Sequence, residues 1–168
     1  MHFQTIILLV SFLIIGCCGG NQQSGFENEE PISSAPIAKS KIITTDTLFL
    51  DALGANMSEM KFNKKVIRVP ANKNITIALT NRSSDSTMPH NIVIIKKGFA
   101  NDVGQAGLNH NENAYFKPND QNVIAHSPLA QIGETVYFSF KTPRIGNYEF
   151  ICSYPGHCGL MKGEFITK

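Results

Sequence analysis

The sequence predicts an all-β domain, built as an eight-stranded Greek-key β-sandwich. Short apolar segments bounded by turn residues recur at the spacing typical of such sandwiches. In residues 73–80, apolar and small polar side chains alternate with the two-residue period of a half-buried strand. The hydrophobic content of 42%, with 11 Phe, is sufficient for the core of one domain.

We expect the strands at residues 41–50, 60–69, 73–80, 90–96, 123–127, 134–141, 146–152 and 163–167. One face of the sixth strand, which we assign to the core, carries Val136, Phe138 and Phe140. In the seventh strand, Tyr148 and Phe150 share a face with Cys152, which therefore points into the sandwich. For residues 98–115, propensity predicts a loop with one or two helical turns around residues 102–108.

The domain is predicted to span residues 41–168, after an N-terminal export segment. Residues 6–15 are almost wholly apolar but too short for a membrane span of about 20 residues, so we assign residues 1–16 to a signal peptide. The apolar run ends in Ile-Ile-Gly-Cys17, which resembles a bacterial lipobox. We therefore expect lipidation of Cys17 and an exported lipoprotein at the periplasmic or extracellular face of a membrane. The alternative is an ordinary signal peptide with two incidental cysteines.

Residues 17–40 are predicted to form a flexible tether, because their Gly, Gln, Ser, Glu and Pro residues offer little to pack. The tether would let the domain reach membrane-bound partners, or it would serve only as a spacer. The formal net charge of +2 is too small to indicate a nucleic-acid partner. Membrane contact is expected through the lipid anchor only.

Residues 152–161, Cys-Ser-Tyr-Pro-Gly-His-Cys-Gly-Leu-Met, are the most informative part of the sequence. The Pro-Gly pair interrupts any regular element, so a loop can bring Cys152, His157 and Met161 around one ion. A second imidazole comes from His90, in Met-Pro-His-Asn before an apolar strand. A thiolate and two imidazoles in a plane, with a weak axial thioether, form the ligand set of a blue-copper electron-transfer centre. The sequence therefore predicts a site for one type 1 copper ion.

Over residues 41–168 the sequence resembles the cupredoxins, and within them the azurins. The likeness lies in the loop from Cys152 to Met161 with the Lys-Gly that follows it, in Met-Lys-Phe-Asn at residues 60–63, and in residues 115–126. It implies a cupredoxin-like sandwich with a short helical flap at residues 98–115. The resemblance also implies that the equatorial copper ligands are His90, Cys152 and His157 and that the axial ligand is Met161.

The resemblance further implies partners for the sulfur atom of Cys152. Backbone N–H groups of Asn91 and Tyr154 are expected to donate to it, and the Asn91 side chain is expected to join the two ligand-bearing segments. Pro89 stands where azurins have glycine, and its carbonyl is a candidate weak axial ligand. The usual azurin disulfide is missing, and Cys158 places a second sulfur directly after a ligand.

In cupredoxins the loop histidine reaches the surface within an apolar ring. The resemblance implies such a docking patch around His157, formed by Met60, Met88, Pro89, Tyr154, Pro155 and Leu160. We expect a monomer that shuttles electrons between redox proteins, such as a cytochrome c and a terminal reductase or oxidase. An enzyme is not expected, because a copper enzyme needs a second, His-rich site; His110 and His126 are expected to be solvated surface residues.

A copper delivery or storage protein is the alternative function. Cys158 would then add a further soft donor to the Cys/His/Met cluster, and Cys152 and Cys158 could form a disulfide in the absence of metal. Copper(II) bound through Cys152 in a carrier gives an intense colour that disappears reversibly on reduction. A colourless copper protein would favour delivery.

Overall fold

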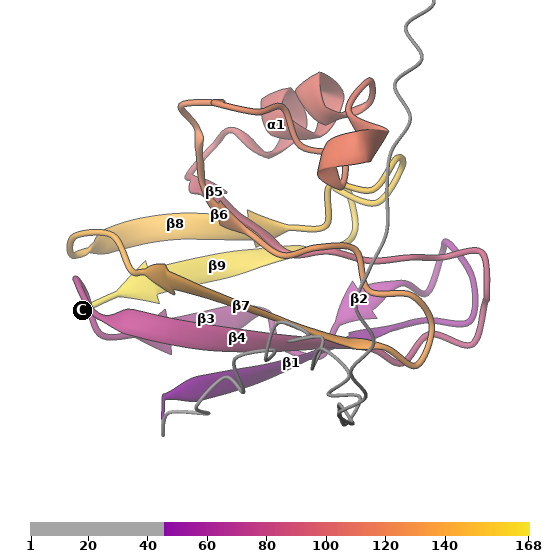
Figure 1. Cartoon of the computed structure of the whole chain (residues 1–168), viewed down its shortest axis with the longest axis horizontal. Coiled ribbons are helices and arrows are strands. Elements are labelled where there is room, and N and C mark those ends of the chain that lie inside the picture. Colours follow the sequence, from indigo (N-terminus) through magenta and orange to yellow (C-terminus); the bar gives the residue numbers. More distant parts are fainter. Residues whose placement is uncertain (1–45) are drawn as a thin grey trace, which may run out of the picture. The chain divides into compact units, whose positions relative to one another are not determined.

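Two β-sheets face each other in the computed structural model, which describes residues 46–168 (Figure 1). The first sheet has the strand order β2 (Lys61–Phe62), β1 (Thr47–Leu53), β4 (Asn74–Asn81) and β7 (Thr135–Lys141). The second has the order β3 (Val66–Val69), β9 (Lys162–Thr167), β8 (Gly146–Ile151), β5 (Val93–Lys96) and β6 (Val123–His126). The predicted all-β sandwich is confirmed.

Most neighbouring strands are antiparallel, but β1 pairs with β4 and β3 pairs with β9 in parallel. Each of these parallel pairs joins strands that are not consecutive in the sequence. The described residues belong to the unit Lys41–Lys168. The predicted signal peptide, Cys17 and the tether lie outside the described residues. Within residues 46–168, no helix is long and apolar enough to cross a membrane.

The predicted strand at residues 60–69 was wrong as a single element. It consists of β2, in the first sheet, and β3, in the second, so residues 46–168 hold nine strands. The break occurs at Asn63, whose side chain accepts from the Asp51 N–H (3.0 Å) and donates to the Asp51 carboxylate (3.0 Å). These bonds hold Asn63 against β1, and the chain then crosses to the second sheet before β3 begins at Val66.

The core lies between the two sheets. Val136 and Phe138 are each 8% exposed, and Phe140 packs against the same cluster, so the predicted core face of β7 is confirmed. Phe62 and Phe150 meet edge to face across the sandwich, with ring centroids 5.3 Å apart. Burial of each large apolar side chain contributes about 1.5–3 kcal/mol.

The strand β5 is apolar on both faces because both faces are covered. Ile94 points into the core between the sheets, whereas Val93 and Ile95 pack under Val103 of the helix α1 (Ala100–Gly107). Figure 1 shows α1 over the five-stranded sheet, on the side away from the first sheet. The predicted helical flap is confirmed, and a short 3₁₀ turn, Asn111–Asn113, completes it.

A tight turn ends the flap. Ala114 and Tyr115 both have left-handed backbone conformations, with φ of 54° and 59°. A Cβ added to Gly107 would overlap the carbonyl oxygen of Tyr115, so α1 and this turn are in close backbone contact. The turn brings Ala114 and Tyr115 towards the predicted metal site.

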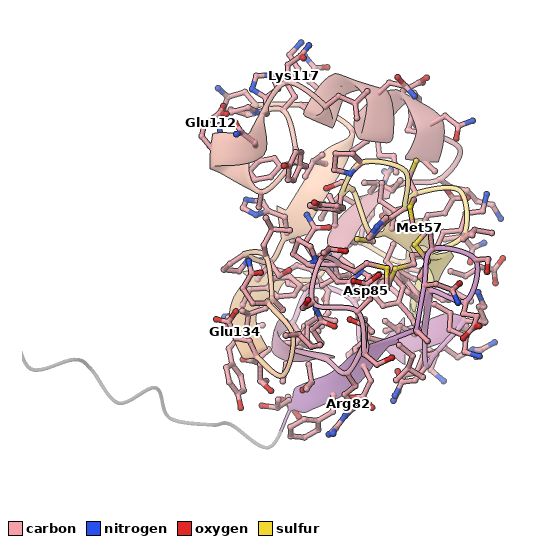
Figure 2. The ribbon with its side chains drawn as sticks, turned by 90° about the vertical axis from the view of Figure 1, so that its right-hand side faces the viewer. Met57, Arg82, Asp85, Glu112, Lys117 and Glu134 are labelled. Carbon is pink, nitrogen blue, oxygen red and sulfur yellow. The ribbon has the colours of Figure 1, made fainter. Side chains whose placement is uncertain are left out.

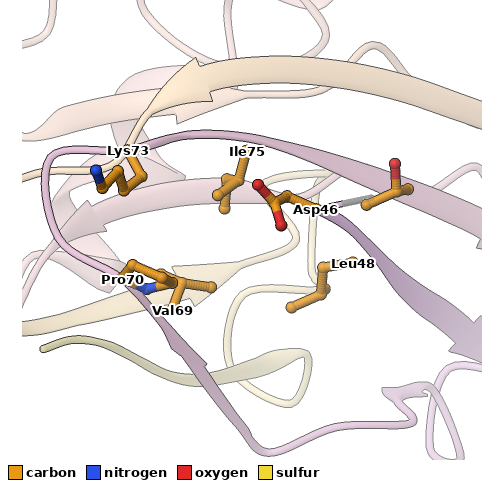
Figure 3. A pocket seen from close by; sticks show the side chains of 7 residues that line it. Asp46, Leu48, Val69, Pro70, Lys73 and Ile75 are labelled. Atoms are coloured by element: carbon orange, nitrogen blue, oxygen red, sulfur yellow. The ribbon is translucent and has the colours of Figure 1, made fainter. Parts of the chain in front are cut away.

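An open pocket lies at the opposite end of the sandwich from that site. Its volume is about 540 Å³, and its lining side chains include Asp46, Leu48, Val69, Pro70, Lys73 and Ile75 (Figure 3). None of these residues is among the predicted ligands.

Candidate metal centre

His90 is fixed by backbone pairing just before β5. Its N–H donates to the Ala130 carbonyl (3.1 Å), and its carbonyl accepts from the Ala130 N–H (2.7 Å). Buried Asn81 supports this bridge, because its Nδ2 donates to the carbonyls of Met88 (2.9 Å) and Ala130 (3.0 Å). Sequence reasoning missed Asn81, since an Asn at the end of a strand resembles an ordinary turn residue.

Residues 152–161, hereafter the ligand loop, are closed by backbone hydrogen bonds. The N–H of Cys152 donates to the Met161 carbonyl (2.9 Å), and the N–H of Met161 donates to the His157 carbonyl (2.8 Å). Gly156 has a φ of 82°, in the left-handed region that favours glycine. The loop therefore folds back, as predicted, so that Cys152 and Met161 at its two ends are hydrogen-bonded to each other and His157 is bonded to Met161.

The ligand loop and His90 bring three donor atoms together. The Sγ of Cys152 lies 3.6 Å from Nδ1 of His157 and 3.8 Å from Nδ1 of His90, and all three ligand atoms lie within 4.8 Å of one another. Donors bound in a trigonal plane at about 2.0–2.3 Å from one ion are separated by about 3.7 Å, so this spacing fits a metal ion. The three side chains are buried, and in residues 46–168 no other group of His, Cys and acidic residues has this geometry.

Burial determines the protonation of the three donors. Desolvation raises the pKa of the Cys152 thiol to about 12. Desolvation, with the neighbouring His157, lowers the pKa of His90 to about 4, and desolvation also lowers the pKa of His157. At neutral pH the metal-free site therefore holds a thiol and two neutral imidazoles, and a metal ion has to displace the thiol proton.

Two backbone N–H groups, of Asn91 and Tyr154, donate to the Cys152 sulfur and partly offset the raised pKa of its thiol. The Asn91 side chain accepts from the Ser153 N–H (2.8 Å) and donates to Ser153 Oγ (2.8 Å). These contacts join the two ligand-bearing segments, as expected. Asn91 Nδ2 also donates to the carbonyl of Ala114 (2.6 Å), which ties the flap to the site and was not predicted.

Known proteins share this sequence pattern and this fold. Residues 51–168 match the family described as copper binding proteins, plastocyanin/azurin family. The chain belongs to this family. Auracyanin-A of Chloroflexus aurantiacus is 31% identical over 165 residues, which cover 96% of this chain and 93% of that protein. The solved structure of auracyanin A, described as a "blue" copper protein, matches with a TM-score of 0.65 over 73% of this chain and 98% of that one.

Two further relatives come from other organisms. Azurin of Pseudomonas chlororaphis is 36% identical over 120 residues, covering 66% of this chain and 91% of that protein. Outer membrane protein H.8 of Neisseria meningitidis is 36% identical over 110 residues, covering 62% of this chain and 60% of that protein. The fold is thus the cupredoxin fold, and the site formed by His90, Cys152 and His157 is that of a single type 1 copper ion.

Met161 lies near this cupredoxin copper site. Its side chain is fully buried in the same core cluster as Cys152, whereas Pro89 is half-buried before His90. The axial roles expected for the Met161 thioether and the Pro89 carbonyl stay predictions.

The predicted docking patch needs a correction. Met60 packs into the core cluster that contains Cys152 and Met161. Met60 and Met88 are each only 3% exposed, so neither offers surface to a partner. Leu160 is 50% exposed. Met57, which sequence reasoning missed, is 52% exposed and lies beside the ligand loop (Figure 2), with its Cε 2.9 Å from where a Cβ on Gly156 would stand. The other three predicted members, Pro89, Tyr154 and Pro155, are half-buried.

Cys158 does not join the group of donor atoms. It is a free, half-buried thiol, and its Sγ packs against α1, 2.8 Å from where a Cβ on Gly104 would stand. Cys152 is also a free thiol. In the delivery hypothesis, the Cys158 sulfur is an additional metal donor. In the structure, this sulfur contacts the flap instead.

The two remaining described histidines have other contacts. Nδ1 of His110 lies 3.2 Å from the Glu112 carboxylate, and the exposed His126 ring stacks on Phe116 with centroids 3.7 Å apart. The expectation that His126 lies at the surface is confirmed, and neither residue belongs to the donor group.

Proposed function

We propose that the protein is an exported one-electron carrier in which His90, Cys152 and His157 are the equatorial copper ligands and Met161 is the weak axial ligand. The convergence of three buried donors within 4.8 Å of one another, in a chain of the plastocyanin/azurin family, supports this proposal most directly. Bound copper supplies a Cu(I)/Cu(II) couple in a geometry that the thioether tunes. The chain makes and breaks no substrate bonds and is not an enzyme.

The protein's contribution is to hold the donors still. The backbone bridge at Ala130 fixes His90, and the hydrogen bonds across the ligand loop fix Cys152 and His157. Two N–H groups directed at the Cys152 sulfur stabilise its negative charge as a thiolate. Because these contacts lie within packed backbone, a change of one charge at the site requires little rearrangement.

We assign electron exchange to the surface next to His157. The Tyr154 ring lies with its centroid 4.8 Å from that of His157, and the exposed Leu160 follows in the same turn. The half-buried Pro89 and Pro155 extend this apolar surface. Small apolar surfaces of this kind suit brief encounters with redox proteins such as a cytochrome c or a terminal reductase or oxidase.

The lipobox supports anchoring through Cys17 to the periplasmic or extracellular face of a membrane, with residues 17–40 as the tether. We expect the domain to act as a monomer. The likeness to outer membrane protein H.8 supports export. Mass spectrometry of the membrane fraction tests the anchor: a diacylglyceryl group on Cys17 is expected, and a chain released with an unmodified N-terminus contradicts it.

Optical and electron-spin spectra of the copper-loaded protein test the carrier function. We expect an intense visible band that ascorbate removes and an oxidant restores over many cycles. Cys152→Ser should abolish the band, whereas Cys158→Ser, the matched sulfur control, should keep it. A colourless copper protein, or loss of the metal in each cycle, would overturn the carrier proposal in favour of copper delivery.

A further inference from the structure

A groove opens beside the ligand loop, on its Leu160 side. Its volume is about 780 Å³, and it runs between the loop and the segments around β2. Its charged lining residues are Glu59, Lys61, Lys65 and Arg82. Since the Leu160 N–H donates to the His157 carbonyl (3.1 Å), one wall of the groove is part of the turn that holds a copper ligand.

The positive charge in this groove is only partly neutralised. Arg82 Nε donates to the Asp51 carboxylate (2.9 Å), which offsets its charge. Lys61 and Lys65 are exposed, and neither forms an ion pair within residues 46–168. The single acidic lining residue, Glu59, accepts a hydrogen bond from Asn56 Nδ2 (2.9 Å). The Asn56 amide is neutral, so Glu59 keeps its charge. Lys61 and Lys65 outweigh this one carboxylate, and the groove therefore has a net positive charge beside exposed Leu160.

We propose that this groove, together with exposed Leu160 and Met57, docks a redox protein whose contact face has an apolar centre flanked by carboxylates. The inference rests on the carrier function proposed above and adds the charge of the partner. Lys61 and Lys65 steer the acidic side of the partner into the groove, and Leu160 then meets its apolar centre. Complementary charge of this kind raises the association rate and selects among partners more than it raises affinity.

The other end of the sandwich provides a matched control. Lys73 and Lys141 are exposed and stand where β4 begins and β7 ends, and Figure 3 shows Lys73 at the rim of the remote pocket. Along β4, Lys73 lies about 30 Å from Arg82. Along β3, Lys65 lies about 16 Å from Pro70, which lines the remote pocket with Lys73. Both separations exceed the screening length of about 10 Å at 0.1 M salt. Removing these two lysine charges lowers the net charge as much as removing Lys61 and Lys65 does, but it has little effect on the electrostatic potential in the groove.

Stopped-flow oxidation of the Cu(I) protein tests the proposal with two small probes. In each reaction one electron passes from the reduced copper centre to the probe, hexacyanoferrate(III) or tris(phenanthroline)cobalt(III), and no bond is formed. We expect Lys61→Gln/Lys65→Gln to slow the anionic probe by about threefold to tenfold at about 0.1 M ionic strength and to speed the cationic probe. Both effects should disappear in about 0.5 M salt. The visible spectrum and the midpoint potential should stay unchanged.

The control pair Lys73→Gln/Lys141→Gln should change both rates less than twofold. Equal effects of the two pairs would show that only net charge matters and would overturn the proposal, as would unchanged rates in the groove variant. Reduced plant-type ferredoxin, an acidic protein, extends the test to a partner of protein size, and it passes one electron to the Cu(II) form. The rate at which ferredoxin reduces the copper protein should fall in the groove variant alone. A wild-type protein that cannot cycle between oxidation states would overturn the carrier function itself, which distinguishes the two failures.

Discussion

Asn91 connects three segments that the sequence keeps apart. Its amide bonds to Ser153 in the ligand loop and to Ala114 in the flap, while its backbone N–H faces the Cys152 sulfur. An unsatisfied buried polar group costs about 1–3 kcal/mol, so the loss of several such bonds is costly even without metal.

Asn91→Ala should lower the free energy of unfolding of the metal-free protein by about 3 kcal/mol, because it leaves buried partners in Ser153 and Ala114 unpaired. Urea denaturation measures this loss. Asn63→Ala is the control, since it removes an exposed amide pair with Asp51 and should cost less than about 1 kcal/mol. Equal losses in the two variants would contradict the role given to Asn91.

Metal uptake near pH 7.5 should release one proton per ion. The pKa of the Cys152 thiol, about 12, keeps it protonated at this pH, whereas the lowered pKa values of His90 (about 4) and His157 leave both rings neutral. Each unit of pH should therefore strengthen binding about tenfold in this range. Proton counting during addition of Co²⁺ or Zn²⁺ measures it, with Cys152→Ser expected to release none. Release of two protons would mean that an imidazole is charged.

Sequence reasoning found the residues with distinctive chemistry and missed those whose role depends on packing. Cys152, His157 and Met161 share one short loop, so their convergence could be predicted. Asn81 and Met57 could not be, because an Asn at a strand end and a Met in a loop are ordinary until the neighbouring backbone is placed. Likewise, the burial of Met60 in the core cluster depends on the packing of the two sheets, which the sequence alone does not show.

Among the elements, the flap shows a constraint set by backbone contact. Gly107 in α1 meets the Tyr115 carbonyl, and the Tyr115 ring packs edge-on against Tyr154, with centroids 5.0 Å apart. Propensity predicted the helix only approximately, because the close contact between Gly107 and the Tyr115 backbone determines where the helix ends. The split of residues 60–69 was missed because both halves have strand-like composition and only the Asn63 contacts separate them.

Gly107→Ala should destabilise the protein by about 3 kcal/mol, because the added methyl group overlaps backbone that cannot move without shifting Ala114 and Tyr115. Thermal unfolding measures it. Gly159→Ala in the ligand loop is the control: nothing lies within 4 Å of its added Cβ, so a change within about 0.5 kcal/mol is expected. If Gly107→Ala left the stability unchanged, the flap would move freely against the site.

For the whole molecule, metal binding and folding are coupled. His90 precedes β5, and the other donors lie in the loop between β8 and β9, so the site exists only when both segments are folded. At a free metal concentration 1,000 times the dissociation constant, a ligand that binds only the folded state adds about 4 kcal/mol.

Copper should therefore raise the midpoint of thermal unfolding in a concentration-dependent manner, and a chelator should reverse the rise. Calorimetry of the loaded and stripped protein measures the difference. Cys152→Ser should unfold at nearly the same temperature with and without the metal. A metal-independent midpoint in the wild-type protein would place the ion outside the folded site.

The pairing of β3 with β9 joins Val66 to Glu164 and Val69 to Thr167. Contacts over such long stretches of sequence form slowly, since a large loop must close first. β9 directly follows the ligand loop, and the Met161 carbonyl already pairs with Cys152. A nascent chain whose residues 162–167 are still inside the ribosome consequently cannot form the β3–β9 pair, so the copper site is completed only after these residues have emerged.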